Sequence, residues 1–473
     1  MPLILGTNSI KDTGYDVANS VRFNDNDSAY MHKTPGSAGD QQKFTFSFWI
    51  KRSNIETGTT MTLFDTQADG DNQFKIRLND NSTLTVESKV SDHNDSLITN
   101  QLFRDVSAWY SIIIAVDTTQ GTAGNRVKLY VNGTRVTSFA TENYPAENLN
   151  TLVNAANKLY VGTSVGTDSF YDGYLAEFCL VDGSQLAETS FGEFDSDSGI
   201  WKPIDVSGLT FGTNGFYLDF EASDNLGNDA NGGTDLTEVN LAATDQSIDT
   251  CTNNFATLNP LNYGANYTFS EGNLQFAQSA TNWDTAYSSI AVTKGKWYME
   301  FKGKVGAYYD VGVTDVITPT TNPSVSTGGV AWKSNSEFAQ GGNVGGGLPS
   351  NVTSPASNTY TADDIIGIAL DVDNETVYFR KNGGSWEVNS NPESGASKTG
   401  GTDLPNSGST YFFAFAAYKG SAASGTGQVN FGGGSVDAIS SGNQDADGFG
   451  NFEYAVPSGY FALCTKNLAE YGG

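Results

Sequence analysis

The sequence predicts an all-β protein built from two antiparallel β-sandwiches, and three observations lead to this fold class. One hairpin pattern occurs twice: IIIAVD (112–117) continues through a polar loop into VKLYVNG (127–133), and IGIALD (366–371) continues through DNET into VYFRKNG (377–383). No sustained apolar period of 3.6 residues predicts helices, whereas Gly, Asn, Ser and Thr separate short apolar runs. The 473 residues suit two sandwiches of about 200 residues each.

The two hairpins share an alternation of apolar and polar residues. In the first copy Val127, Leu129 and Val131 fall on one face of a strand, and in the second copy Val377 and Phe379 do so. We expect the opposite face of each strand to be solvated. Each copy ends in Asn-Gly, a dipeptide that tolerates the positive φ angles of a tight two-residue turn.

Composition excludes several classes of function. The net charge is −28, and the 25 Lys and Arg residues form no cluster, so no nucleic-acid partner is expected. Cys179, Cys251 and Cys464 are too few and too scattered for a disulfide framework or a zinc site. We recognise no signal peptide and no apolar run of transmembrane length, so we expect folding in a cytoplasm and no membrane insertion.

The chain divides into five segments on its composition. We expect an N-terminal arm at 1–17, a first sandwich at 18–205, a flexible connector at 206–263, a second sandwich at 264–435 and a C-terminal tail at 436–473. The connector contains the polar stretch NLGNDANGGTDLTEVN and an Asn-Pro break, although GFYLDF within it also suits a last strand of the first sandwich.

Five elements of the first half occur in a characteristic order: FSFWI, WYSIIIAVD, VKLYVNG, LYVGT and DGYLAEFCLVDG. Over about 1–205 this order resembles the laminin-G-like members of the concanavalin A-like jelly rolls. In the second half GKWYMEF (295–301), ALDVDNETVYFRKNG (369–383), WEV (386–388) and YFFAFAAYKG (411–420) read as strands. Over about 264–435 they resemble the SPRY domain, which is also a bent antiparallel sandwich.

A laminin-G-like jelly roll joined to a SPRY-like module, after a start MPLILGTNSIKDTGYDVANS, resembles virion surface proteins of tailed phages, especially marine ones. The resemblance implies a non-enzymatic tail fibre or appendage that binds a host-surface glycan or protein and leaves the host cytoplasm by lysis. We expect attachment to other virion proteins through PLIL in the arm. A homotrimer is implied by the resemblance alone. The first alternative is a capsid decoration or head-fibre protein.

The second alternative is a glycan-degrading enzyme, because the jelly-roll superfamily includes glucanases whose catalytic carboxylates alternate along one strand. GEFDSDSG places Glu193, Asp195 and Asp197 at that spacing. A retaining pair needs two carboxyl groups roughly 5 Å apart across a groove, one of them in an apolar setting. The alternate positions here are Ser196 and Ser198 rather than apolar residues, so an acidic loop is the expected reading.

Metal binding is expected, if anywhere, in FDTQADGDNQF (64–74). Asp65, Asp69 and Asp71 supply hard oxygen ligands that suit Ca²⁺, and laminin-G-like domains carry calcium at their rim. The alternative is a solvated hairpin loop. No other cofactor is expected.

Ligand binding is expected on loops of the second sandwich, because rigid sandwiches present specificity there. The aromatic candidates are Tyr308, Tyr309, Trp332 and Trp386, whose rings could stack on sugars. Trp332 and Trp386 lie in strand-like stretches, so a core position is the alternative for both.

Overall fold

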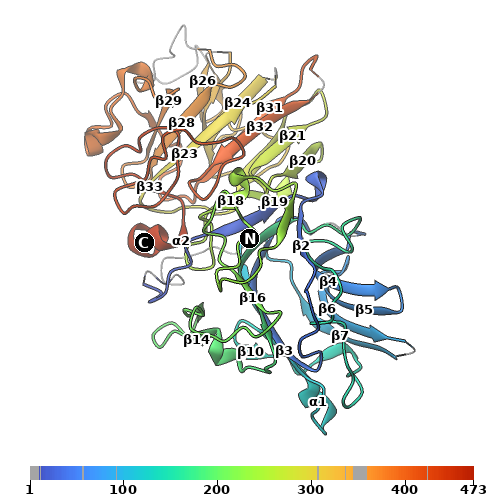
Figure 1. Ribbon diagram of the computed structural model, residues 1–473. Helices are drawn as coiled ribbons and strands as arrows, with labels where there is room; N and C mark the ends of the chain where they lie inside the picture. Colours follow the sequence, from blue (N-terminus) through green and yellow to red (C-terminus); the bar gives the residue numbers. More distant parts are fainter. Residues whose placement is uncertain are drawn as a thin grey trace. The chain divides into compact units, whose positions relative to one another are not determined.

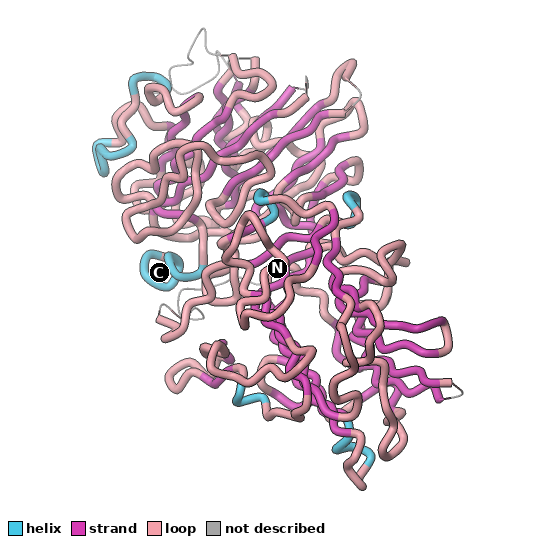
Figure 2. The backbone as a smooth tube through the Cα atoms, viewed as in Figure 1, coloured by secondary structure: helices cyan, strands magenta, loops and turns pink. Residues whose placement is uncertain are grey.

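The computed structural model describes residues 10, 12–55, 58–91, 93–305, 308–335, 337–344, 359–422 and 424–472. Strands are far more extensive than helices, as Figure 2 shows, and α1 (Ala123–Arg126) and α2 (Thr465–Tyr471) are short. The chain forms two compact units, an N-terminal unit at Thr13–Thr252 and a C-terminal unit that includes Asn253–Gly473. The expected all-β class with several antiparallel sheets is confirmed.

Two large sheets make up the N-terminal unit (Figure 1). The first sheet has, in spatial order, β10 (Thr134–Arg135), β9 (Val127–Val131), β8 (Trp109–Asp117), β3 (Lys43–Arg52), β13 (Gly173–Asp182), β1 (Ser20–Phe23) and β18 (Gln246–Ser247), and β16 (Phe216–Leu218) also pairs with β13. The second has β11 (Phe139–Glu142), β7 (His93–Leu102), β6 (Thr83–Val90), β5 (Asn72–Leu78), β4 (Met61–Asp69), β12 (Leu159–Val161), β2 (Tyr30–Lys33) and β17 (Thr237–Val239).

The core of this unit lies between the two sheets. Strand β3 contributes Phe44, Phe46, Phe48 and Ile50, all fully buried. The opposite face of the first sheet is buried as well, in a second apolar cluster that includes Trp49. Burial on both faces explains why β8 and β13 have few polar residues.

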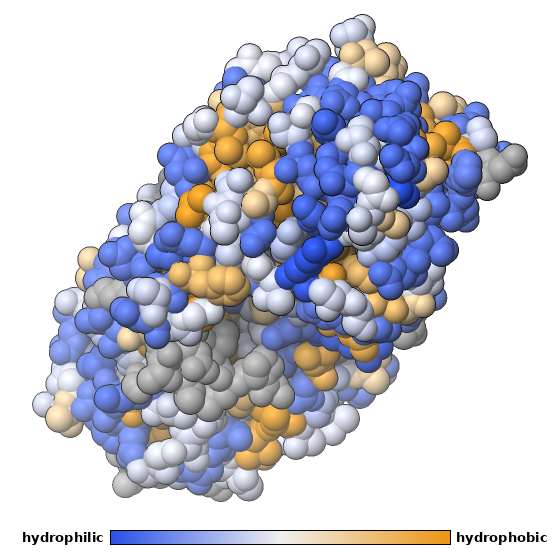
Figure 3. Space-filling view, turned by 90° about the horizontal axis from the view of Figure 1, so that it is seen from below, coloured by the Kyte–Doolittle hydropathy of each residue, from blue (hydrophilic) through white to orange (hydrophobic). Residues whose placement is uncertain are grey.

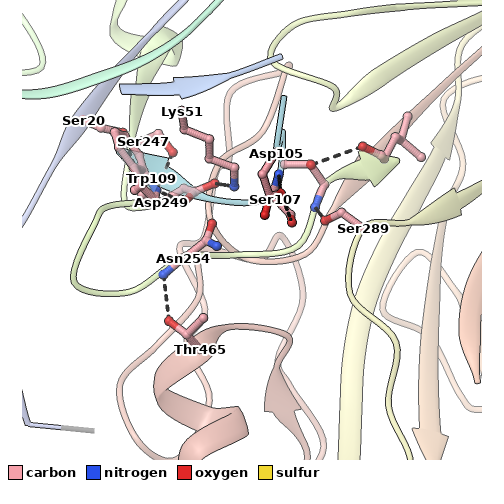
Figure 4. Close-up of polar contacts among 12 residues, drawn as sticks. Ser20, Lys51, Asp105, Ser107, Trp109, Ser247, Asp249, Asn254, Ser289 and Thr465 are labelled. Atoms are coloured by element: carbon pink, nitrogen blue, oxygen red, sulfur yellow. Dashed lines mark hydrogen bonds and ion pairs between the residues drawn. The ribbon is translucent and has the colours of Figure 1, made fainter. Parts of the chain in front are cut away.

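The structure differs from the expected flexible connector at 206–263. Three strands of this range, β16, β17 and β18, pair with β13, β2 and β1 of the N-terminal unit. Beyond β18, the side chain of Asp249 receives hydrogen bonds from Lys51 Nζ at 2.6 Å and from Trp109 Nε1 at 3.1 Å (Figure 4). Residues up to 252 therefore complete the first sandwich, because its outer apolar face needs a cover.

The C-terminal unit also contains two sheets. One has, in spatial order, β19 (Leu258–Tyr263), β22 (Asp284–Ser288), β31 (Phe412–Tyr418), β24 (Tyr308–Thr314), β25 (Gly329–Lys333), β26 (Phe338–Gln340) and β27 (Asn343–Val344). The other has β20 (Tyr267–Ser270), β21 (Gln275–Gln278), β32 (Gly425–Asn430), β23 (Lys296–Gly303), β28 (Ile365–Asp371), β29 (Thr376–Lys381) and β30 (Thr402–Asp403), and β33 (Phe461–Ala462) pairs with β23.

A small separate sheet, β14 (Gly192–Phe194) with β15 (Trp201–Pro203), belongs to the N-terminal unit.

The segment at 436–473 was expected to be a tail, but its described residues belong to the C-terminal unit. Strand β33 runs parallel to β23, and Leu463 and Leu468 are buried in the core of the unit. The segment also explains a second difference: both faces of β29 are buried, where we expected one solvated face. Arg380 on that outer face donates hydrogen bonds to Tyr298 Oη and to the carbonyl of Ala455.

Both expected Asn-Gly turns form, each with positive φ at both residues. Asn132 and Gly133 join β9 to β10, and Asn382 and Gly383 follow β29. A Cβ atom on Gly133 would lie 2.1 Å from the ring of Trp201, and one on Gly383 would lie 2.2 Å from the ring of Tyr454. Glycine is required in each turn by its backbone conformation and by the aromatic ring above it.

Candidate functional site

Three aromatic residues lie in a row at one end of the first sheet of the C-terminal unit. Tyr308 begins β24, Tyr418 ends β31 directly opposite it, and Trp283 immediately precedes β22. The centroid of the Tyr418 ring is 6.1 Å from that of Tyr308 and 5.7 Å from that of Trp283. We call these residues the aromatic row.

The aromatic row reaches the solvent. Tyr308 is 56% exposed, and Tyr418 and Trp283 are half-buried. The chain leaves β31 through Gly420, which has a φ of +57°, and a Cβ atom there would be within 3.8 Å of both Tyr308 and Tyr418. Because the rings stand on adjacent strand ends, their spacing is fixed by the sheet rather than by mobile side chains alone.

The other three aromatic candidates are placed differently. Tyr309 is buried: its ring packs against Phe301, and its hydroxyl is hydrogen-bonded to the carbonyls of Val305 and Thr426. Trp332 is fully buried and stacks on Phe338. Both residues are core residues, which is the alternative stated above for Trp332, and neither ring is exposed to a ligand.

Trp386 is half-buried, and the guanidinium of Arg380 lies 4.7 Å from the centroid of its ring. The expected strand WEV is a 3₁₀ turn at Glu387–Asn389. Tyr308 is thus the one predicted ligand residue that belongs to the aromatic row. Sequence reasoning missed Trp283 and Tyr418. Tyr418 ends the apolar run YFFAFAAY, whereas Trp283 has polar neighbours on both sides and no such signal.

The three expected calcium ligands do not converge. Asp65 is fully buried, receives a hydrogen bond from Ser164 Oγ at 2.9 Å and lies 3.7 Å from Lys75 Nζ. Burial raises the pKa of Asp65. In the β4–β5 hairpin, Asp69 receives hydrogen bonds from Asn72 and from the amide of Asp71, whose carboxylate pairs with Lys89 Nζ at 2.7 Å.

Across the part of the chain that the structure describes, no group of three or more His, Cys, Asp or Glu side chains is arranged to hold a metal ion. For this hairpin there are two physical reasons. Asp65 and Asp69 are four residues apart along the extended strand β4, roughly 13 Å, and lysines already neutralise two of the three carboxylates.

The acidic stretch at 192–199 lies at the edge of the N-terminal unit, on β14 and the turn after it. Lys202 lies 3.3 Å from Glu193 and 3.8 Å from Asp195. Asp195 closes the turn by accepting hydrogen bonds from the hydroxyl and the amide of Ser198. These contacts lower the pKa of Asp195, and the hydroxyl hydrogen bond is the largest cause. A general acid needs a raised pKa, so this carboxylate has the opposite property.

A second aromatic cluster lies on the outer face of the second sheet in the N-terminal unit. His32 on β2 is opposite Tyr160 on β12, with ring centroids 6.3 Å apart, and Tyr30 lies within 6.3 Å of His32, Tyr160 and Phe170. All four side chains are half-buried. Sequence reasoning did not single out this cluster, although Tyr30 and His32 alternate with the buried Met31.

On the face that Figure 3 shows, hydrophobic residues lie in small groups between hydrophilic ones. Among the described residues, the helices are too short and too polar to cross a membrane.

Residues 24–188 match the family model of the concanavalin A-like lectin/glucanases superfamily, Laminin_G_3. The matched range lies within the N-terminal unit and contains β2 to β13. The resemblance expected for the first half is therefore confirmed over this range. A search of curated proteins found no significant match to the chain.

Several solved structures resemble parts of the chain. The SPRY domain of human HERC1 is 13% identical with a TM-score of 0.28, covering 38% of this chain and 99% of that one. A heptameric SAP-like pentraxin from Limulus polyphemus is 15% identical with a TM-score of 0.28, covering 37% and 80%. The CBM40 of a Ruminococcus gnavus IT-sialidase is 12% identical with a TM-score of 0.24, covering 33% and 94%. Similarity at this level indicates neither activity nor ligand.

Proposed function

We propose that the protein is a non-enzymatic adhesin on the surface of a phage virion, a tail fibre or appendage, and that the aromatic row binds a host-surface glycan. The observation that carries the proposal is the exposed row of Trp283, Tyr418 and Tyr308 on three adjacent strand ends. The lectin/glucanase superfamily match of residues 24–188 supports the same class of ligand for the chain.

The geometry suits a saccharide chain. Aromatic rings offer large apolar faces at a low cost in side-chain entropy, and sugars present CH-rich faces that pack on them. Ring centroids 5.7 and 6.1 Å apart place successive rings under successive parts of an extended ligand. Because the sheet holds the rings, little ordering is needed on binding.

The virion location rests on the resemblance of the whole architecture to phage surface proteins. The net charge of −28 keeps exposed copies soluble and apart. Several copies on one particle would convert weak single contacts into firm attachment through effective concentration. The PLIL segment expected to join the virion lies outside the described residues.

Capsid decoration is the first rival function, and it predicts that the purified protein binds no host cells.

Glycan degradation is the second rival function. Lys202 beside Glu193 and Asp195 favours an acidic surface turn over a catalytic pair. Incubation with host polysaccharide should therefore release no reducing ends; release that Glu193→Gln abolishes would replace the proposal with the enzyme.

Binding of the full chain to purified host-surface polysaccharide tests the proposal directly. Trp283→Ala and Tyr308→Ala should each weaken binding by about tenfold or more, since single aromatic contacts dominate many interfaces. Phe194→Ala is the matched control, because Phe194 is 53% exposed but lies in the N-terminal unit. Equal binding by all three variants, or host binding that protease treatment of the cells removes, would contradict a glycan site at the aromatic row.

A further inference from the structure

A cavity of about 210 Å³ lies over the outer face of the second sheet in the C-terminal unit. Its floor consists of side chains from three adjacent strands: Gln428 and Asn430 on β32, Lys302 and Glu300 on β23, and Ile365 on β28. The segments at 435–440 and 453–454 form its walls. The cavity has room for far more than one water molecule but is smaller than the roughly 300–1,000 Å³ of drug-sized sites.

The walls are held in place by buried hydrogen bonds. Glu300 is 3% exposed, and its carboxylate accepts the amides of Glu453 and Tyr454, each at 2.9 Å. Burial raises the pKa of Glu300. Glu453 in turn accepts hydrogen bonds from the amide and the hydroxyl of Ser440. The cavity is thus built before any ligand binds, because both wall segments are tied to the sheet or to each other.

Two of the charges that line the cavity, those of Lys302 and Asp437, compensate each other. One carboxylate oxygen of Asp437 accepts hydrogen bonds from Lys302 Nζ at 2.6 Å and from Lys304 Nζ at 2.9 Å. The carboxylate of Asp363 lies 3.1 Å from Lys304 Nζ and 3.9 Å from Lys302 Nζ. An anionic ligand would have to displace one of these carboxylates from its lysine, whereas a neutral ligand would not.

The remaining lining is amphipathic. Ile365, Ile439 and the ring of Tyr454 supply apolar surface. The side-chain amide of Gln428 donates to Gln275 at 3.0 Å, and its carbonyl oxygen accepts no hydrogen bond from the described residues. Apolar side chains beside polar groups suit a small ring with an apolar face and a polar edge.

From these four observations we infer that the cavity is a second binding site, for a single neutral sugar residue such as the terminal pyranose of a glycan. The choice of sugar as the ligand class rests on the proposed function, but the cavity shares no lining residue with the aromatic row. An extended glycan would bind at the row, and a terminal or branch sugar would bind in the cavity.

Titration of the full chain with neutral monosaccharides tests the inference. The probes are glucose, galactose, mannose and N-acetylglucosamine, and glucuronate and inorganic phosphate are the charged comparisons. Binding is measured by saturation-transfer NMR and by calorimetry. At least one neutral sugar should bind saturably with one site per chain, and neither charged probe should bind more tightly.

Two variants locate the site. Ala438 is exposed on the cavity wall, so Ala438→Trp should fill the cavity and abolish monosaccharide binding without disturbing the core. Tyr454→Ala should weaken binding by up to about tenfold through the lost ring contact. Unfolding midpoints equal to that of the parent chain show that each variant is folded.

Trp283→Ala separates this inference from the proposed function, since it should reduce polysaccharide binding and leave monosaccharide binding unchanged. Monosaccharide binding that survives Ala438→Trp, tighter binding of a charged probe, or no saturable binding of any neutral sugar would overturn the cavity assignment. Each of these results leaves the test of the aromatic row intact.

Discussion

Lys51 and Asp249 form an ion pair inside the N-terminal unit, with 2.6 Å between Nζ and Oδ2, although 198 positions separate them in the chain. Both side chains are almost fully buried. The second oxygen of Asp249 accepts the indole N–H of Trp109, and the hydroxyl of Ser20 donates to the backbone carbonyl of Asp249. This set of contacts, drawn in Figure 4, fixes the end of a segment that composition alone identifies as a linker.

Removal of one partner should therefore destabilise the unit strongly. Asp249→Ala leaves the Lys51 ammonium buried without its carboxylate, so we expect the free energy of unfolding to fall by about 3–5 kcal/mol. Urea unfolding of the full chain, followed by tryptophan fluorescence, measures this. We also expect new protease cleavage between residues 221 and 252, where the parent chain should resist.

The matched control is Asp71→Ala, which removes an ion pair with Lys89 of similar length, 2.7 Å, at an exposed site. Its expected cost is small, because solvent screens an exposed ion pair. The double variant Lys51→Met, Asp249→Leu should lose much less stability than Asp249→Ala, because it removes both buried charges. Similar losses for Asp249→Ala and Asp71→Ala would contradict this account.

A buried carboxyl in the same unit predicts a pH dependence of stability. Burial raises the pKa of Glu177 from 4.5 to about 7, and the hydroxyl of Tyr217 lies 2.9 and 3.0 Å from its two oxygens. The hydrogen bond from Tyr15 lowers the pKa of Glu177, and the negative charges of Asp219 and Glu221 raise it. Between pH 4.5 and 7 the folded state binds more protons than the unfolded state, so stability should fall as pH rises, by about 3 kcal/mol in all.

Glu177→Gln should abolish that contribution, because the amide does not titrate. Unfolding free energies measured at intervals from pH 4 to 8 provide the comparison, and Glu147→Gln, at an exposed position, should retain the slope of the parent chain. A Glu177→Gln variant with the same slope as the parent chain would show that Glu177 does not titrate in this window.

Calcium should have little effect on the β4–β5 hairpin. Lys75 lies 3.7 Å from Asp65, and Lys89 pairs with Asp71, so a cation would have to displace two ammonium groups to gather the three carboxylates. We expect melting temperatures in EDTA and in millimolar CaCl₂ to agree within about 1 °C, since a ligand that does not bind the folded state gives no stabilisation. A higher melting temperature in calcium than in EDTA, lost in the Asp69→Ala variant, would support the calcium site.

Alternation along strands made much of the fold predictable. Val127, Leu129 and Val131 are buried on one face as expected, and both Asn-Gly turns form. The same rule indicates which of two adjacent tyrosines faces inward: Tyr309 is in phase with the buried Val311 and Val313, so Tyr308 points the other way. The sequence prediction grouped the two tyrosines and did not use this phase.

Long-range packing was not predictable from local pattern. The polar stretch NLGNDANGGTDLTEVN makes residues 206–252 resemble a linker. They nevertheless cover the outer face of the first sheet because that face is apolar, with Trp49, Trp109 and Tyr174 in it. Asp310 is in phase with Tyr308 but is fully buried, held by Asn322, and its pKa is raised to about 6 by burial. On this face of β24 only the first residue, Tyr308, is therefore exposed to solvent. No local sequence signal indicates which residues of the strand are covered by other segments.

The aromatic row also predicts how the purified protein should compete with phage. If the protein is an adhesin, it should bind host cells and slow adsorption of intact phage, whereas a capsid decoration protein should do neither. Trp283→Ala and Tyr308→Ala should lose both effects together, because the same rings carry both, and Phe194→Ala should retain them.

Copies linked on a bead should compete at a far lower chain concentration than the soluble chain, since multivalency raises the effective concentration at the cell surface. Adsorption kinetics with the soluble and bead-bound forms measure this, and imaging of the virion gives an independent result. Density for the protein at the tail fits the adhesin, while a lattice of copies on the head, together with unchanged adsorption, would favour decoration.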